Sequence, residues 1–253
     1  MTKNRYLVYY GPASADSIHD ALKRSLHVAA EDCNAAGRIL LLLESAWARE
    51  DPYLVQALDR LLSRQTRRLL QRRQEVSLSG KLSVAMGLAR AVTSTLNAII
   101  TINPHPDSLR NVVERHHFGG PRLVIPYHLD SVRDWFRTWQ PTVIPGGEWP
   151  GPKLPPIDPI AVRAATSLNP DGHRRYLKNF LVDNAQNLLW ELRQAGVLPA
   201  PADIRLAADR TGFEPKSADR LAAMTDRMAS RKTPPRATYF PDASTLREVI
   251  DDL

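Results

Sequence analysis

Six arginines and no acidic residue occupy the stretch from residue 60 to residue 73. Several of them recur at intervals of three and four residues, the spacing that aligns side chains along one face of a helix. Guanidinium groups pair bidentately with phosphate, and like charges this close repel unless a polyanion or carboxylates neutralise them. We predict a cationic stripe on a helix over residues 54–73 that grips a phosphate backbone; the alternative is a solvated surface face. The stripe consists of Arg60, Arg64, Arg67, Arg68, Arg72 and Arg73.

A second basic group lies near the C-terminus, where the pattern predicts two short helices at 202–211 and 217–230. Ala208, Gly212 and Ala218 stand between them at the spacing of small residues and turn glycine in helix-turn-helix modules, so residues 204–223 resemble such a module. An ordinary helical hairpin with Gly212 at a helix end is the alternative. The nucleic-acid contacts predicted here are Lys216, Ser217, Arg220, Arg227, Arg231 and Lys232.

Polar residues also follow the predicted strands. In open α/β sheets, ligands bind beyond the carboxyl ends of the strands, so these residues form a candidate pocket. Glu44, Ser45, His105 and His128 are the catalytic candidates if the protein is an enzyme, because carboxylate and imidazole groups perform acid–base chemistry or bind a metal. Asp107 and Asp130 fit helix N-caps equally well. The remaining strand-end residues are Gly11, Ser14, Asn103 and Tyr127.

Familiar catalytic and cofactor motifs are missing from the sequence. There is no GxxxxGK[ST], GxGxxG, GxSxG or HExxH, and no Cys and His residues have the spacing of a structural zinc site. We therefore predict no metal and no cofactor, and leave open whether the protein is an enzyme.

The first 145 residues alternate short apolar runs with helical patterns. This alternation predicts an α/β domain at 1–145 with an open, mostly parallel, Rossmann-like sheet of three layers. The predicted strands are 5–10, 38–43, 98–102, 122–125 and 142–144, and the predicted helices are 14–30, 52–74, 81–96, 107–115 and 130–139.

Proline and glycine mark the end of this domain. Residues 146–159 form a Pro/Gly-rich joint that neither a helix nor a central strand would tolerate. A smaller, all-α basic domain is predicted at 160–236, with helices at 160–166 and 173–195 before the candidate helix-turn-helix. Residues 237–253 are predicted to form an acidic C-terminal tail.

Composition narrows the class of protein. The chain has 253 residues, a net charge of +7 and one cysteine, Cys33, which excludes an internal disulfide framework. No apolar run approaches the roughly 20 residues of a membrane span, and no signal peptide is apparent. We predict a cytoplasmic protein without membrane attachment, and the positive charge favours polyanionic partners.

Three functions remain open. The leading hypothesis is a nucleic-acid-binding protein, DNA or RNA, that acts as an accessory or regulatory component of a prokaryotic system handling DNA or RNA. Nucleic-acid binding would explain both the arginine stripe and the basic residues of the C-terminal helices. The first alternative is a non-catalytic subunit of a larger assembly with other protein subunits. The second is an enzyme acting on a phosphorylated or nucleotide-like substrate at the strand ends.

Overall fold

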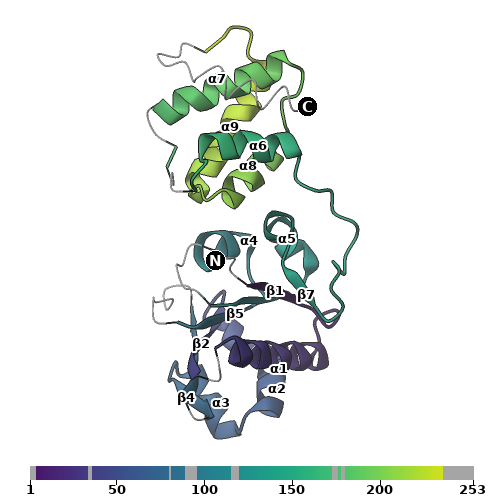
Figure 1. The fold of residues 1–253 in the computed structure, drawn as a ribbon. Coiled ribbons are helices and arrows are strands. Elements are labelled where there is room, and N and C mark those ends of the chain that lie inside the picture. The colour runs from purple at the N-terminus through teal and green to yellow at the C-terminus, as the bar shows by residue number, and fades with distance from the viewer. Residues whose placement is uncertain are drawn as a thin grey trace. The chain divides into compact units, whose positions relative to one another are not determined.

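The computed structural model describes residues 4–33, 36–79, 81–88, 96–114, 120–172, 176–177 and 180–235. The chain divides into two compact units, Met1–Leu154 and Pro155–Leu253, called unit 1 and unit 2 below (Figure 1). The division falls inside the Pro/Gly-rich segment. The predicted acidic tail at 237–253 lies outside the described residues.

Unit 1 is built on a mixed, mostly parallel sheet, and the prediction of an α/β fold is confirmed. Within the described residues the sheet has seven strands in the order β3-β4-β2-β5-β6-β1-β7. All neighbours pair in parallel except β3 and β4, which are antiparallel. The strands are β1 (Arg5–Val8), β2 (Ala36–Leu43), β3 (Val76–Ser79), β4 (Lys81–Leu88), β5 (Ala98–Ile102), β6 (Arg122–Ile125) and β7 (Thr142–Ile144).

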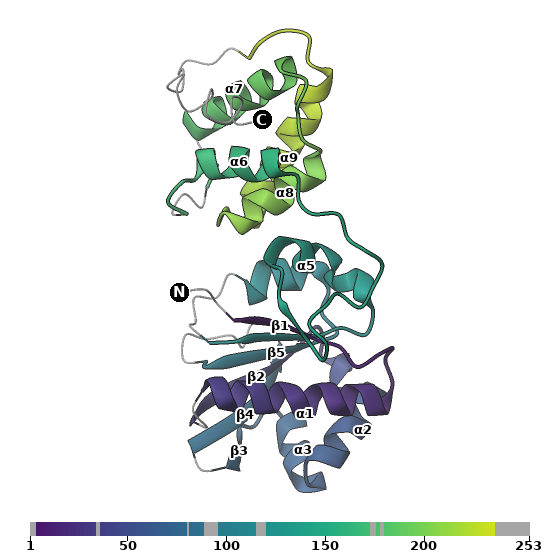
Figure 2. The same cartoon turned by 45° about the vertical axis from the view of Figure 1, so that its right-hand side comes forward.

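Helices cover both faces of this sheet because side chains alternate along each strand. In β2, Ile39 and Leu41 face one apolar cluster, while Leu40 and Leu42 face the other. The first cluster is completed by α1 (Ala15–Asp32), α2 (Pro52–Leu61) and α3 (Arg64–Gln71). The second face carries α4 (Pro106–Ser108), the π-helix η3 (Leu109–Val113), the 3-10 helix η4 (Leu129–Val132) and α5 (Arg133–Trp139). Figure 2 shows α1 and α5 on opposite sides of the strands.

Two sequence predictions in unit 1 are wrong. The helix predicted at 81–96 is strand β4 over Lys81–Leu88, in which Leu82, Val84 and Met86 alternate onto the face of α1 and α2. Sheet packing outweighs the helix propensity of the alanine, leucine and methionine in this segment. The single helix predicted at 52–74 is two helices: Leu62 takes an extended conformation, and the Ser63 side chain caps α3 by accepting the Thr66 N–H.

The amino ends of β1 and β6 hold a buried charge network. Arg5 donates to both carboxylate oxygens of Glu114, the shortest contact being 2.7 Å from Nη2, and the Trp135 indole N–H donates to the same carboxylate at 2.9 Å. Arg122 is fully buried; its Nε donates to the Val113 carbonyl at 2.9 Å and lies 3.9 Å from Glu114. Burial lowers the pKa of Arg122 to about 10 against the opposing charge of Glu114, so the group stays cationic at neutral pH.

Unit 2 is helical, with α6 (Pro159–Leu168), α7 (Phe180–Gln194), α8 (Pro201–Arg210) and α9 (Pro215–Ser230) among its described residues. These helices share one apolar core that includes Leu189, Leu192, Ala208 and Leu221. Across the described part of the chain, no helix is both long and apolar enough to cross a membrane.

Candidate functional site

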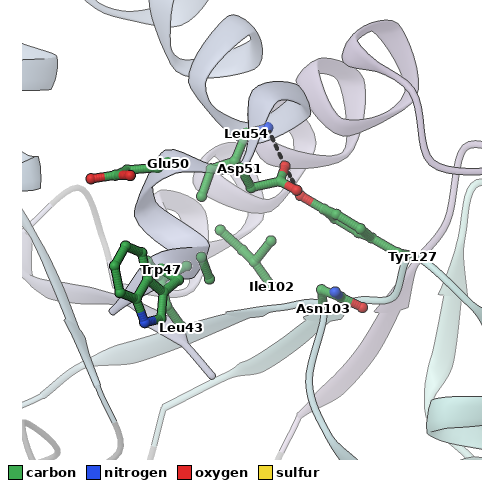
Figure 3. Close-up of a pocket in the computed structure, with 9 residues that line it drawn as sticks. Leu43, Trp47, Glu50, Asp51, Leu54, Ile102, Asn103 and Tyr127 are labelled. Atoms are coloured by element: carbon green, nitrogen blue, oxygen red, sulfur yellow. Dashed lines mark hydrogen bonds between the residues drawn. The ribbon is translucent and has the colours of Figure 1, made fainter. Parts of the chain in front are cut away.

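A cavity of about 260 Å³ opens at the carboxyl ends of β2, β5 and β6 in unit 1 (Figure 3). The chain leaves β2 toward α2 on one face of the sheet, and leaves the neighbouring strand β5 toward α4 on the other. Connections that diverge from adjacent parallel strands open a crevice, which is where open α/β sheets bind ligands. The lining residues are Leu43, Trp47, Ala48, Glu50, Asp51, Leu54, Ile102, Asn103 and Tyr127.

Asp51 and Tyr127 form the fixed wall of this cavity. Asp51 precedes α2 as its N-cap, and its Oδ1 accepts both the Leu54 N–H at 2.9 Å and the Tyr127 hydroxyl at 2.7 Å (Figure 3). Burial raises the pKa of Tyr127 well above its ordinary value, and the hydrogen bond to Asp51 and its charge raise it further. Tyr127 is therefore a neutral phenol that orients Asp51, and its ring meets Tyr53 edge-on at 6.3 Å.

Asn103 follows β5 with a left-handed backbone, φ +45°. A residue with a side chain rarely takes this conformation, although asparagine tolerates it better than most. The Asn103 N–H donates to the Ile125 carbonyl at 2.8 Å, which ties the turn to the end of β6. The exposed side chain thus presents an amide, both donor and acceptor, at the cavity (Figure 3).

The outer rim of the cavity comes from the 3-10 helix η1 (Trp47–Glu50), between β2 and α2. Trp47 is 80% exposed, and Glu50 is exposed as well. The nine lining residues include two carboxylates and neither lysine nor arginine. The cavity is therefore acidic and partly aromatic, and it would repel a phosphate group.

The strand-end rule led to Asn103 and Tyr127 but not to Trp47, Glu50 or Asp51, which also line the cavity. The Asp51-Pro52 pair was the available signal, because it marks the start of the helix that follows β2, and that helix begins at the same end of the sheet as the predicted pocket.

The predicted catalytic candidates do not line the cavity. The Glu44 carboxylate accepts the main-chain N–H of His105 at 3.2 Å and the Ser108 hydroxyl at 2.8 Å, so it holds the start of α4. The His105 ring is exposed and accepts the Asp107 N–H at 3.4 Å as the N-cap of α4. Ser45 and His128 are exposed.

The alternative roles suggested for two aspartates need correction. His105 and His128, rather than Asp107 and Asp130, occupy the N-cap positions, and both aspartates lie in the first turn instead. Among the described residues, no three His, Cys, Asp or Glu side chains gather in a way that could hold a metal.

The arginine-rich segment separates into paired and unpaired residues. Arg60 on α2 forms an ion pair with Asp16 of α1, and Arg67 on α3 pairs with Asp59 and donates to Gln71. The other four side chains are exposed and make no ion pair or hydrogen bond with the described residues. They are Arg64 and Arg68 on α3, Arg72 at its C-cap and Arg73 directly after it, together called the α3 arginine face below.

This face is regular and reaches the rim of the cavity. Arg64, Arg68 and Arg72 follow one another at four-residue intervals, which places their backbones about 6 Å apart along the helix axis. The Gln71 amide donates to the carbonyl of Arg49 in η1 at 3.1 Å. Burial lowers the pKa of Arg49, and the charge of Arg73 lowers it further, so Arg73 lies within electrostatic range of η1.

In unit 2, α8 and α9 pack closely around a turn that needs glycine. Gly212 has φ +93°, and a Cβ added there would lie 3.1 Å from the Gly172 carbonyl oxygen. Ala208 and Ala218 are fully buried, and Leu221 is nearly so. The small residues and the turn glycine therefore allow α8 and α9 to pack closely, as they would in a helix-turn-helix or in an ordinary helical hairpin.

Two of the residues predicted to touch nucleic acid form hydrogen bonds with the main chain of Leu177, and of the two only Ser217 is buried. The buried Ser217 hydroxyl accepts the Leu177 N–H at 3.0 Å. The Arg220 guanidinium donates to the Leu177 carbonyl at 3.0 Å. Lys216, Arg227 and Lys232 are exposed, and Arg231 is partly exposed and donates to the carbonyls of Thr233 and Pro234.

The fold and cavity define an α/β protein with an acidic strand-end pocket beside a cationic helix face. No family model, no curated protein and no solved structure matches the chain.

Proposed function

We propose that the protein binds nucleic acid by its phosphate backbone through the α3 arginine face, in an accessory or regulatory role. The proposal rests on the observation that one run of arginines contains both paired and unpaired side chains. Two of its arginines are neutralised by carboxylates, and four are left exposed without a partner among the described residues. A polyanion supplies the neutralising charge that those four lack.

The geometry of α3 favours a linear polyanion over a single small anion. Arg64 and Arg68 on α3 and Arg72 at its C-cap follow one another at intervals of about 6 Å along the axis, so their guanidinium groups can engage consecutive charges on a chain. The net charge of +7 attracts the same partner at long range.

The experiment is a titration of fluorescent single-stranded and duplex DNA and RNA at about 50 and 200 mM salt. Four phosphate contacts predict an affinity that falls roughly 50- to 150-fold between these two concentrations. Changing Arg64, Arg68 and Arg72 together to glutamate should remove most of this binding and flatten its salt dependence.

The matched control changes Lys23, Arg24 and Lys81 to glutamate. All three are exposed residues of unit 1 outside α3, and the change in net charge is the same. Equal losses in both variants would reduce the effect to overall charge and contradict the proposal. If none of the four probes binds at low salt, the proposal is contradicted, and a role as a subunit of a protein assembly is favoured instead.

We further propose that unit 1 is a Rossmann-like, doubly wound domain and that α8 and α9 form a helix-turn-helix. Support for the first comes from the diverging connections after β2 and β5. Support for the second comes from the buried small residues and the positive φ of Gly212. Changing Lys216 and Arg227 to glutamate should then weaken duplex binding more than single-strand binding, and equal weakening would count against a groove-reading module.

A further inference from the structure

The strand-end cavity has no role in the phosphate binding proposed for the α3 arginine face. It is small, at about 260 Å³, just below the roughly 300–1,000 Å³ typical of pockets for drug-sized ligands. We propose that this cavity binds a nucleobase that carries an exocyclic amino group: adenine, guanine or cytosine. The inference rests on the cavity alone and does not require the α3 arginine face.

The apolar and aromatic walls suit a flat ring. Leu43, Leu54 and Ile102 line the interior, while Trp47 lies at the rim and is 80% exposed. Every nucleobase has a flat π-face that can stack on an indole ring, so this contact suits any base. Stacking would also cover apolar surface that Trp47 otherwise exposes to water.

The polar groups select for an amino-bearing base edge. Asp51 offers its Oδ2, because its Oδ1 already accepts the Leu54 N–H and the Tyr127 hydroxyl, and Asn103 adds one amide that can both accept and donate. Glu50 adds negative charge at the rim, with its carboxylate directed away from the other labelled side chains (Figure 3). The hydroxyl of Tyr127 already donates to Asp51, so it leaves the cavity richer in acceptors than in donors. Exocyclic amino groups of adenine, guanine and cytosine supply the missing donors, whereas the exocyclic groups of uracil and thymine are carbonyl oxygens, which leaves only the ring N3–H as a donor on that edge.

The charge of the cavity decides where a phosphate would lie. Since the lining holds two carboxylates and no cation, the base enters while its sugar and phosphate stay outside. Gln71 of α3 donates to the Arg49 carbonyl in η1, which connects the outer rim to α3. The base could therefore come from a free nucleoside or from a strand whose backbone lies on the arginine face.

The experiment measures equilibrium binding of adenosine, guanosine, cytidine and uridine to the full chain. We expect millimolar or tighter binding of at least one amino-bearing nucleoside and weaker binding of uridine. Trp47→Ala should weaken binding about fivefold or more. Glu50→Gln and Asn103→Gly should each weaken it as well; glycine accepts the left-handed backbone and removes only the amide.

Matched controls outside the cavity are Tyr10→Ala for the exposed aromatic ring and Asp226→Asn for the carboxylate. Both should bind nucleoside as the wild type does. The proposal is overturned if no nucleoside binds at millimolar concentration, if uridine binds equally well, or if the three cavity variants bind unchanged.

A second arm separates the two sources of the base and the two proposals. If Trp47→Ala weakens binding of oligo(dA) more than of oligo(dT), the base belongs to a strand; if only nucleosides respond, the ligand is free. The Arg64, Arg68 and Arg72 triple variant should keep its nucleoside affinity. Loss of salt-dependent strand binding without loss of nucleoside binding would therefore separate failure of the arginine face from failure of the cavity.

Discussion

The two ends of the sheet in unit 1 use the same kinds of residue for opposite purposes. At the amino end, Arg5, Glu114 and Trp135 satisfy one another in a buried network around the fully buried Arg122. At the carboxyl end, Trp47 and Glu50 stand exposed at the rim of a cavity. Residue type therefore does not mark a site; what distinguishes the two ends is whether the polar and aromatic groups already have partners inside the fold.

The largest expected effect tests the amino end. Glu114→Gln removes the carboxylate that faces Arg5 and Arg122, so a buried guanidinium loses its counter-charge. We expect the free energy of unfolding, measured by urea denaturation, to fall by about 3–5 kcal/mol. Asp226→Asn, an exposed change of the same chemistry, should alter it by less than about 0.5 kcal/mol. A loss below about 1 kcal/mol for Glu114→Gln would mean that the network does not hold this end together.

The next effect tests the fixed wall of the cavity. Tyr127→Phe keeps the ring but removes the hydroxyl that donates to Asp51, and should cost about 1–2 kcal/mol near neutral pH. The pKa of Tyr127 is raised in the folded protein, so its contribution to stability is complete below the ordinary value near 10 and declines as the pH rises above it.

The difference in stability between wild type and Tyr127→Phe should therefore be constant from about pH 7 to 9 and shrink above about pH 10. Denaturation at a series of pH values measures it. A difference that grows with pH would contradict a phenol held in its protonated form.

A smaller effect tests the backbone at Asn103. Asn103→Ala should lower the free energy of unfolding by about 1 kcal/mol, because alanine tolerates the left-handed conformation less well than asparagine. Asn103→Gly should be neutral or slightly stabilising. Thermal unfolding of the two variants side by side measures the difference, and equal stabilities would show that this turn relaxes freely.

The smallest effect tests the rim. Because Trp47 is 80% exposed, Trp47→Ala should change the free energy of unfolding by no more than about 0.5 kcal/mol. Urea denaturation measures this change. A substantial loss would give Trp47 a structural role and weaken the contrast between the two ends of the sheet.

Much of the fold was predictable because buried parallel strands leave a strong local signal. The apolar runs at β2, β5 and β6 were recognised, and the resulting α/β assignment is confirmed. Strand β4 was missed because its alanine, leucine and methionine also suit a helix, and only its pairing with β2 and β3 decides the matter.

Less of the cavity was predictable. The strand-end rule led to Asn103 and Tyr127, because it depends only on where strands stop. The contact between Tyr127 and Asp51 joins residues 76 positions apart, and the pair of Arg5 with Glu114 joins residues 109 positions apart. Contacts between residues this far apart leave no repeating pattern in a single sequence. Such partners can therefore be identified only from the folded structure.

The outermost strands of the sheet limit how the protein can associate with itself. β3 has four residues with an irregular register against β4, and β7 has three residues and is followed directly by Pro145, which has no N–H to donate. Short or irregular outer strands offer another chain few backbone groups for pairing. Unit 1 is therefore poorly suited to polymerise through its sheet edges. This favours a protein that does not aggregate through these strands at the high concentrations that titrations with weak ligands need.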